Sequence, residues 1–270
     1  MIDFQIQNKK IDQMSEVLTE NLGDGVFIIK INRPKLLNSL TTNTLRELAK
    51  AFNDLSDKKE TRAVILTGEG RAFSAGIDLT SAIKVFQGEF KPTKETDPVL
   101  AMNDATYPII GAINGYAITG GFEIALACDI LIGGESAAFQ DTHAKFGLMP
   151  SWGLSQKLPR LIGANRARHS ALTATKIDSK TAYEWGLISR VVPDSELLNT
   201  CKQIAKEIVA NHPVLVKNYK NVINTGIEMN FKDAMQHEQD KAWSYYGGMV
   251  KSDFDKMAQF IASRGQKSKL

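Results

Sequence analysis

Two short glycine-bearing segments stand where a strand should end and a helix should begin. They are Ser74-Ala-Gly-Ile-Asp78 and Thr119-Gly-Gly-Phe-Glu123. Gly76 lets the chain turn sharply or approach a ligand closely, because it has no Cβ. The glycine pair of the second segment opens a helix, whose first N–H groups have no partner inside that helix. One N–H from each segment, converging on a single oxygen, would form an oxyanion hole without any charged side chain. Because most such junctions only build the fold, either segment alone is a weak indication of a site.

Glu123 adds a carboxylate to the first turn of the second helix. A carboxylate there can accept a proton or orient a water molecule, although helix N-termini favour acidic residues without any catalytic reason. Neither glycine segment has the spacing of a phosphate-binding loop. Ser74 and Ser151 lack the glycine-flanked setting of a serine nucleophile. The histidines and carboxylates lack the spacing of a zinc site, so we predict no metal.

These segments need strands and helices to hold them. Short apolar or β-branched runs predict strands at residues 26–32, 63–67, 108–113, 129–132 and 137–140, and helical spacing predicts helices over 42–55, from Asp78 onward and over 122–127. Strands and helices that alternate at short intervals are typical of an α/β fold. From about Pro193 the pattern is helical only, so we predict a core over 1–195 and a helical region over 196–270. Residues 86–98, rich in Lys, Glu, Pro and Thr, are expected to form a surface loop.

Composition excludes several classes of protein. The chain has 270 residues, of which 43% are hydrophobic, and its net charge is +3, too small to favour a nucleic-acid partner. No apolar run reaches the roughly 18 to 20 residues that cross a membrane. Cys128 and Cys201 are interpreted as free thiols of a reducing compartment. The first residues resemble neither a secretory nor a transit peptide. The last three, Ser268-Lys-Leu270, match the tripeptide read by the peroxisomal import receptor, so we predict a peroxisomal location.

Three longer segments resemble the crotonase (enoyl-CoA hydratase/isomerase) family in order and spacing. They are Ile31–Leu40, Arg71–Asp78 and Pro108–Asp129. The resemblance covers roughly residues 20 to 265 and becomes looser after 195. It is closest to the single-function peroxisomal hydratases, whose motifs resemble Asp141–Lys145 and Pro150–Lys157. It implies a core that is a spiral of ββα turns, with C-terminal helices that assemble the chain into a trimer or a pair of trimers.

The resemblance also implies roles for individual residues. The N–H groups of Ala75 and Gly120 would hold the oxygen of an acyl-CoA thioester as it becomes an enolate. The segment Ser74, Ala75, Gly76, Ile77 and Asp78 would border the coenzyme A part of the substrate. No separate cofactor is predicted, because coenzyme A enters as part of the substrate. Glu123 would correspond to the first of two catalytic glutamates and would activate the water that adds to the β-carbon.

The sequence departs from the family where the second glutamate is expected, because His143 stands there. An imidazole exchanges protons near neutral pH and can serve the α-carbon or hold the water. Asp141, two residues earlier, is an alternative acid. If both residues continue a strand, alternation places their side chains on one face.

Three functions remain open at this point. The leading one is hydration of a trans-2-enoyl-CoA to a 3-hydroxyacyl-CoA in fatty-acid β-oxidation. An isomerase that moves the double bond needs only one base, which Glu123 supplies. A homologue that binds acyl-CoA without turnover is suggested by the missing second glutamate.

Overall fold

The structure, a computed structural model, describes residues 15–86, 91–255 and 258–259. It divides into two compact units, of which the first runs to Val216 and the second begins at Lys217. The targeting tripeptide Ser268-Lys-Leu270 lies outside the described residues.

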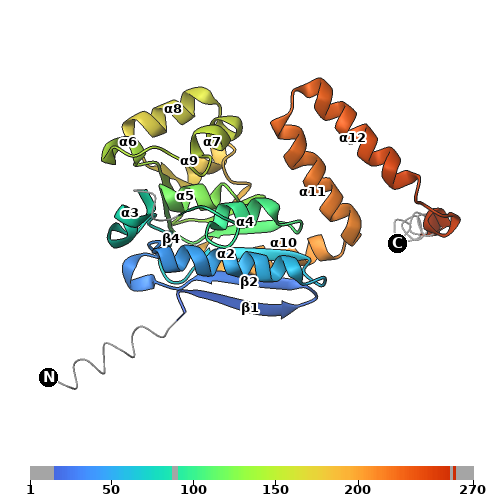
Figure 1. Cartoon of the computed structure of the whole chain (residues 1–270), viewed down its shortest axis with the longest axis horizontal. Helices are drawn as coiled ribbons and strands as arrows, with labels where there is room; N and C mark the ends of the chain where they lie inside the picture. Colours follow the sequence, from blue (N-terminus) through green and yellow to red (C-terminus); the bar gives the residue numbers. More distant parts are fainter. Residues whose placement is uncertain (1–14, 87–90, 256–257, 260–270) are drawn as a thin grey trace, which may run out of the picture. The chain divides into compact units, whose positions relative to one another are not determined.

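The first unit contains two sheets (Figure 1). The larger, in the order β1-β2-β3-β5-β7-β10, consists of β1 (Val17–Gly23), β2 (Val26–Ile31), β3 (Ala63–Gly68), β5 (Ile109–Ile113), β7 (Ile130–Gly134) and β10 (Arg190–Val192). The smaller, in the order β4-β6-β8-β9, consists of β4 (Ala72–Ser74), β6 (Tyr116–Ile118), β8 (Ala138–Gln140) and β9 (Ile177–Asp178). Strands β2, β3, β5, β7 and β10 run parallel, whereas β1 is antiparallel to β2 and β9 to β8.

The helices of this unit are α2 (Thr42–Asp57), α3 (Leu79–Phe86), α4 (Pro98–Asp104), α5 (Gly120–Ala125), α6 (His143–Phe146), α7 (Leu154–Ile162), α8 (Ala164–Thr173), α9 (Ser179–Glu184) and α10 (Leu197–Val209). Three consecutive stretches follow one plan, β3-β4-α3, β5-β6-α5 and β7-β8-α6. In each, the first strand joins the larger sheet, the second joins the smaller sheet, and a helix follows. This repetition is the predicted spiral of ββα turns, and the α/β fold class is confirmed.

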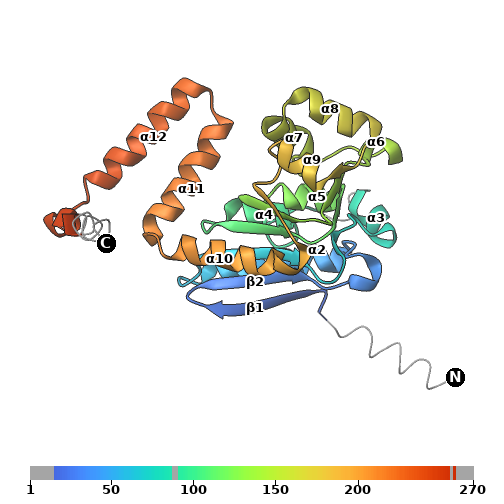
Figure 2. The same ribbon diagram turned by 180° about the vertical axis from the view of Figure 1, so that it is seen from behind.

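Helices cover both faces of the larger sheet. Along β2, Phe27, Ile29 and Ile31 belong to one hydrophobic cluster, with Leu48 of α2, whereas Ile28 belongs to another cluster, with Cys201 of α10. Successive strand residues point to opposite faces, so α2 and α10 lie on opposite sides of the sheet (Figures 1 and 2). A strand buried on both faces is apolar at almost every position, which is why the central strands are plain in the sequence.

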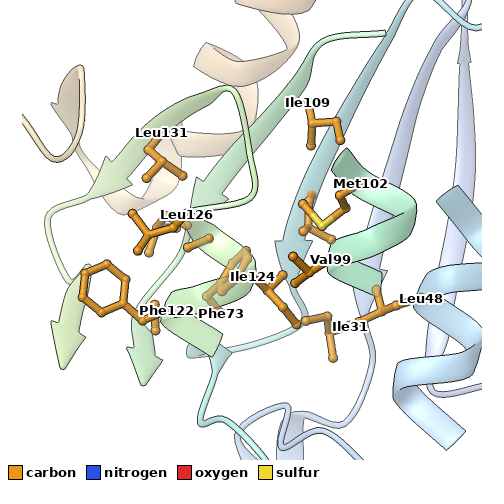
Figure 3. Packing of buried hydrophobic residues seen from close by; sticks show 14 of the residues in the cluster. Ile31, Leu48, Phe73, Val99, Met102, Ile109, Phe122, Ile124, Leu126 and Leu131 are labelled. Atoms are coloured by element: carbon orange, nitrogen blue, oxygen red, sulfur yellow. The ribbon is translucent and has the colours of Figure 1, made fainter. Parts of the chain in front are cut away.

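Packing between the two sheets supports the site described below. Figure 3 shows Phe73 of β4, Phe122 of α5 and Met102 of α4 within one cluster of buried side chains. The rings of Phe122 and Phe139 lie 5.1 Å apart, so α5 is fastened to β8. Truncation of a buried phenylalanine typically costs about 3 to 5 kcal/mol of stability. The loops at the strand ends therefore rest on a rigid base.

The division between the units follows from the packing of α10. Leu197, Cys201 and Ala205 are buried against the larger sheet, so α10 belongs to the first unit although the chain is purely helical from this point. The compact unit consequently runs past the predicted boundary at 195, to Val216. Burial raises the pKa of the Cys201 thiol to about 12, so this cysteine is a packing residue.

Two long helices, α11 (Pro213–Glu228) and α12 (Phe231–Tyr246), follow α10. Asn230 caps α12 by accepting the N–H of Asp233 at 3.1 Å. None of the residues in these two helices is buried. Their exposed large apolar side chains include Tyr219, Ile223, Ile227, Phe231, Met235, Trp243 and Tyr246. In the part of the chain that the structure describes, no helix is both long and apolar enough to cross a membrane.

Candidate active site

Three neighbouring strands of the smaller sheet end at one edge. β4, β6 and β8 lie side by side and run parallel, so their carboxyl ends come together. The segments that follow them are 75–78, 119–120 and 141–143. Loops at the carboxyl ends of parallel strands are the usual place for ligands in α/β proteins. The topology thus gathers all the sequence-predicted site residues at this edge.

The two glycine segments pack directly against each other. Gly76 has a φ of +87°, and a Cβ there would lie 2.7 Å from the Ile118 carbonyl oxygen and 3.4 Å from the Gly120 nitrogen. A Cβ on Gly121 would lie 2.3 Å from the Ser74 carbonyl oxygen. Backbones can approach so closely only where a side chain is missing. These glycines bring the segments after β4 and β6 into contact.

The prediction that the N–H of Ala75 is an oxyanion donor is wrong. Its N–H donates to the Leu37 carbonyl oxygen at 2.9 Å and is therefore occupied. The N–H of Gly76 is also engaged, because it donates to Ser74 Oγ at 3.2 Å. The next amide along the chain, that of Ile77, has no hydrogen-bond partner among the described residues.

The backbone pairing with Leu40 explains which amide of this segment remains free. The Leu40 N–H donates to the Gly76 carbonyl oxygen at 2.8 Å, and the Asp78 N–H donates to the Leu40 carbonyl oxygen at 2.9 Å. The Ile77 N–H, between them, consequently points away from Leu40. Ile77 Cγ1 would lie 3.5 Å from a Cβ on Gly120, the other predicted donor, whose N–H likewise lacks a partner in the described chain. The geometry therefore pairs Gly120 with Ile77.

Ser74 and Asp78, predicted to border the substrate, instead brace the loop. Ser74 is fully buried, and its Oγ donates to the Asn38 carbonyl oxygen at 2.8 Å, so it has no access to a ligand. The Asp78 carboxylate contacts the Arg33 guanidinium at 3.1 Å and accepts from Ser39 Oγ at 2.8 Å. Burial alone would raise the pKa of Asp78, but hydrogen bonds from Thr80, Ser39 and Arg33 hold it well below its usual value. Asp78 therefore stays ionised and ties this loop to the segment after β2.

Glu123 lies in α5, which follows β6, the middle one of these three strands, and is only 2% exposed. Its Oε1 accepts the backbone N–H of Trp152 at 2.9 Å and that of Leu154 at 3.4 Å. Its Oε2 lies 3.7 Å from Nε2 of His143. Burial raises the pKa of Glu123, and the backbone donors together with His143 offset part of that rise. A carboxyl group with a raised pKa is a stronger proton acceptor when ionised.

His143 and Asp141 come together, but for a different reason than strand alternation. β8 ends at Gln140 and His143 begins α6, so the condition for strand alternation, that both residues continue the strand, is not met. Asp141 Oδ1 accepts the backbone N–H of His143 at 3.0 Å and lies 2.7 Å from its Nδ1. Because a carboxylate oxygen only accepts, Nδ1 of His143 donates to Asp141, and Nε2 is turned toward Glu123. Both side chains are buried.

The resulting row of carboxylate, imidazole and carboxylate can exchange protons with a bound molecule. The 3.7 Å separation between Glu123 and His143 is too long for a direct hydrogen bond, so each group can offer its free atom to a water or substrate between them. Two free backbone amides lie at the neighbouring strand ends. No group of three or more His, Cys, Asp or Glu side chains within the described ranges is arranged to hold a metal ion.

Sequence reasoning missed the residues that hold Glu123. Trp152 donates its backbone N–H to Glu123 and its indole Nε1–H to Asp97 Oδ2 at 2.9 Å. Asp97 also caps α4 by accepting the N–H of Val99 at 2.8 Å. The Asp-Pro pair at 97–98 is a recognisable helix start, but nothing in the sequence connects it with Trp152. This chain of bonds ties the Glu123 carboxylate to the beginning of α4.

Comparison with known proteins reveals close relatives. The model of the family described as enoyl-CoA hydratase/isomerase matches residues 21–253. The chain is 48% identical over 260 residues to a probable peroxisomal enoyl-CoA hydratase 1 of Arabidopsis thaliana, and the alignment covers 94% of this chain and 98% of the relative. It is 34% identical over 255 residues to a short-chain-enoyl-CoA hydratase of Clostridium acetobutylicum, with 93% and 97% covered. An enoyl-CoA hydratase of Bacillus anthracis matches the structure with a TM-score of 0.80 at 31% identity, over 92% of this chain and 96% of the other.

Proposed function

Because the chain belongs to the enoyl-CoA hydratase/isomerase (crotonase) family, we propose that Glu123 and His143 perform its proton transfers at the strand edge. The protein adds water to a trans-2-enoyl-CoA to give a 3-hydroxyacyl-CoA. The observation that carries the assignment of residues is the 3.7 Å gap between Glu123 Oε2 and His143 Nε2, beside two free amides. Two groups that exchange protons suit a reaction in which one proton leaves water and another arrives at carbon.

The amides of Ile77 and Gly120 hold the thioester oxygen. Negative charge gathers on this oxygen as hydroxide adds to the β-carbon, and N–H donors fixed in advance stabilise it. One such donor is typically worth about 3 to 4 kcal/mol in the activation free energy. The thioester carbonyl accepts the electron pair, so the addition needs no redox cofactor, and coenzyme A enters only as part of the substrate.

Glu123 and His143 together accept one proton and release one proton in each reaction cycle. Glu123 takes a proton from water as the water oxygen bonds to the β-carbon and the carbon–carbon double bond gives its electrons to the thioester. The imidazolium of His143 then delivers a proton from Nε2 to the α-carbon of the enolate. Transfer of the proton from Glu123 to Nε2 through a water molecule between them restores the ionised Glu123 and the imidazolium of His143. Asp141 takes no part in this exchange and acts as a positioning residue, because its carboxylate fixes the ring through Nδ1.

The decisive experiment follows the loss of the ultraviolet absorbance of the conjugated enoyl thioester. Crotonyl-CoA and a longer trans-2-enoyl-CoA are compared on the wild type, Glu123→Gln and His143→Ala. We expect both variants to lose kcat by about 10²- to 10⁴-fold, the usual contribution of a general acid or base. Full activity of His143→Ala would refute its role as the acid. A wild type that hydrates neither substrate would refute the proposal.

The same purified proteins distinguish hydration from the two alternative functions, isomerisation and acyl-CoA binding without turnover. An isomerase would move the double bond of a 3-enoyl-CoA faster than it hydrates a 2-enoyl-CoA. A binding homologue would release heat on titration with an enoyl-CoA and yet leave it unchanged. The second proton-exchanging group at His143, buried and held by Asp141, favours hydration over both.

We also propose that the chain assembles as a trimer or a pair of trimers through α11 and α12. The support is the exposed apolar side chains of these helices, such as Ile223 and Phe231, since large exposed apolar surface commonly marks an interface. Sedimentation at several concentrations tests the proposal. A monomeric mass throughout would overturn it.

The proposed location is the peroxisome. The Arabidopsis thaliana relative is named as peroxisomal, and this chain ends in Ser268-Lys-Leu270. The import receptor would bind this tripeptide. A fluorescent fusion that carries the wild-type tail should enter peroxisomes, and one that lacks these three residues should stay outside. Equal import of both fusions would contradict the assignment.

A further inference from the structure

Thr119 occupies a backbone conformation that its side chain disfavours. Its φ is 51° and its ψ is −108°, and a β-branched residue at positive φ is a true outlier. Such residues persist only where their surroundings hold them, and they gather at functional sites. Thr119 directly precedes Gly120, whose amide is one of the two free donors. The strain therefore lies one residue from the atom that must be placed.

The Thr119 hydroxyl is used in an unusual way. A threonine at the N-cap of a helix commonly accepts an N–H of that helix. Thr119 stands at the N-cap of α5 and makes no such bond. Its Oγ1 instead accepts the backbone N–H of Thr142 at 3.1 Å and lies 2.5 Å from the hydroxyl oxygen of Thr142. The backbone N–H of Thr119 donates to the Gln140 carbonyl oxygen at 2.9 Å.

This link joins two loops that must act together. Backbone pairing between β6 and β8 ends at Ile118 and Gln140, and the two hydroxyls meet just beyond that point. Thr119 leads into the loop of the Gly120 amide. Thr142 immediately precedes His143 and leads into the loop of the imidazole. The hydroxyl pair thus fastens the oxyanion donor to the acid where the sheet no longer does so.

We propose that the Thr119–Thr142 hydroxyl pair is a positioning device that holds the Gly120 amide and the His143 imidazole at a fixed distance and orientation. The proposal rests on the proposed function of these two groups. Neither hydroxyl is assigned to the substrate; both act through the residue that follows them. Coenzyme A binding does not depend on the relative position of these two groups, whereas the transition state needs both of them at once. Loss of the pair should therefore lower kcat and leave KM nearly unchanged.

Thr142 offers the cleaner test, because its φ of −109° is ordinary and valine has nearly the same shape as threonine. Thr142→Val removes the hydroxyl, and Thr142→Ser keeps it as the matched control. We expect Thr142→Val to lower kcat by about 10- to 100-fold, the scale of a misplacement of about 1 Å, with KM within about twofold of the wild type. Thr142→Ser should keep most of the activity.

Thr119→Gly guards against a failure to fold. Glycine adopts the positive φ without the strain that threonine has there, and this relief opposes the cost of losing the acceptor of the Thr142 N–H. The variant should therefore fold and melt close to the wild type and still lose kcat. In the double variant Thr119→Gly/Thr142→Val the loss should equal that of Thr119→Gly alone, because that change already removes both the hydroxyl pair and the acceptor of the Thr142 N–H.

The outcomes separate this proposal from the hydratase function. Wild-type kcat in Thr142→Val, while Glu123→Gln stays inactive, would overturn the positioning device and leave the hydratase intact. Equal losses in Thr142→Val and Thr142→Ser would also overturn it, because the hydroxyl would then not be the cause. A wild type without hydration would overturn the device together with the function on which it rests.

Discussion

Replacement of Glu123 by glutamine tests the base and its electrostatic cost in one variant. Glutamine keeps the Oε1 that accepts the N–H groups of Trp152 and Leu154, at 2.9 and 3.4 Å. It removes the charge that faces His143. The packing is preserved, so changes in activity and in stability both report on ionisation. Hydration should fall by about 10²- to 10⁴-fold.

The stability change has a sign that follows from the raised pKa of Glu123. A carboxyl group whose pKa is higher in the folded protein is stabilising below its unfolded pKa, and that stability is lost as the pH rises through the folded value. Each unit of the rise costs the wild type about 1.4 kcal/mol once the group is ionised. Glutamine does not ionise and escapes this cost. The variant should therefore gain in melting temperature over the wild type as the pH rises from about 4.5, the usual pKa of the group, toward neutrality.

Thermal melts at a series of pH values measure this difference directly. For a chain of this size, about 1.4 kcal/mol corresponds to roughly 3 to 6 °C per unit of pKa shift. The acid limb of the wild-type kcat profile should lie above the usual pKa for the same reason. A melting difference that stays constant from acid to neutral pH would refute the argument that burial destabilises the ionised form. A glutamine variant that hydrates at the wild-type rate would refute the assignment of the base.

Further predictions concern the residues that hold the site. Asp141→Asn should lower kcat by up to about 10⁴-fold at nearly constant KM, because an amide no longer selects the tautomer with a proton on Nδ1; an unchanged kcat would show that the ring is fixed by other contacts. Trp152→Phe leaves a buried oxygen of Asp97 without its indole donor and should lower the free energy of unfolding in urea by about 1 to 3 kcal/mol, whereas no loss would mean that water replaces the indole. Gly76→Ala should fold poorly, because its Cβ would lie 2.7 Å from a carbonyl oxygen at positive φ. Gly147→Ala, at a φ of +69° with no atom within 4 Å of the added Cβ, should lose only about 1 kcal/mol, and equal losses would show that crowding is unimportant.

The sequence predicted the strands that are buried on both faces, because their apolar runs are unmistakable. It missed β1, whose burial pattern is mostly exposed, because an edge strand with Glu20 and Asn21 has no apolar signature. It also missed β4 and β6, with three residues each, which are too short to show a period. These two strands set the edge where the site forms.

The residues that the sequence singled out lie together in the structure, but their hydrogen bonds were not foreseen. Glu123 and His143 lie 3.7 Å apart, and Gly120 begins the helix that carries Glu123. The occupation of the Ala75 N–H by Leu37, which leaves that of Ile77 free, depends on a contact between segments nearly 40 residues apart and has no local signal. Likewise, Asp141 meets His143 because its carboxylate accepts the backbone N–H at the start of α6, not because a strand continues. Tertiary pairing decided both points.

The proposed catalytic groups come from three separate pieces of chain, which follow β4, β6 and β8. One strand end supplies the Ile77 amide, the next supplies the Gly120 amide and Glu123, and the third supplies the imidazole. Main-chain donors hold Glu123, so its placement does not depend on the side chains of the third strand end. On the proposed roles, replacement of residues 141–143 would change the proton donor and leave the Ile77 and Gly120 amides in place. A change confined to this one loop would then alter the reaction that the protein performs on an acyl thioester.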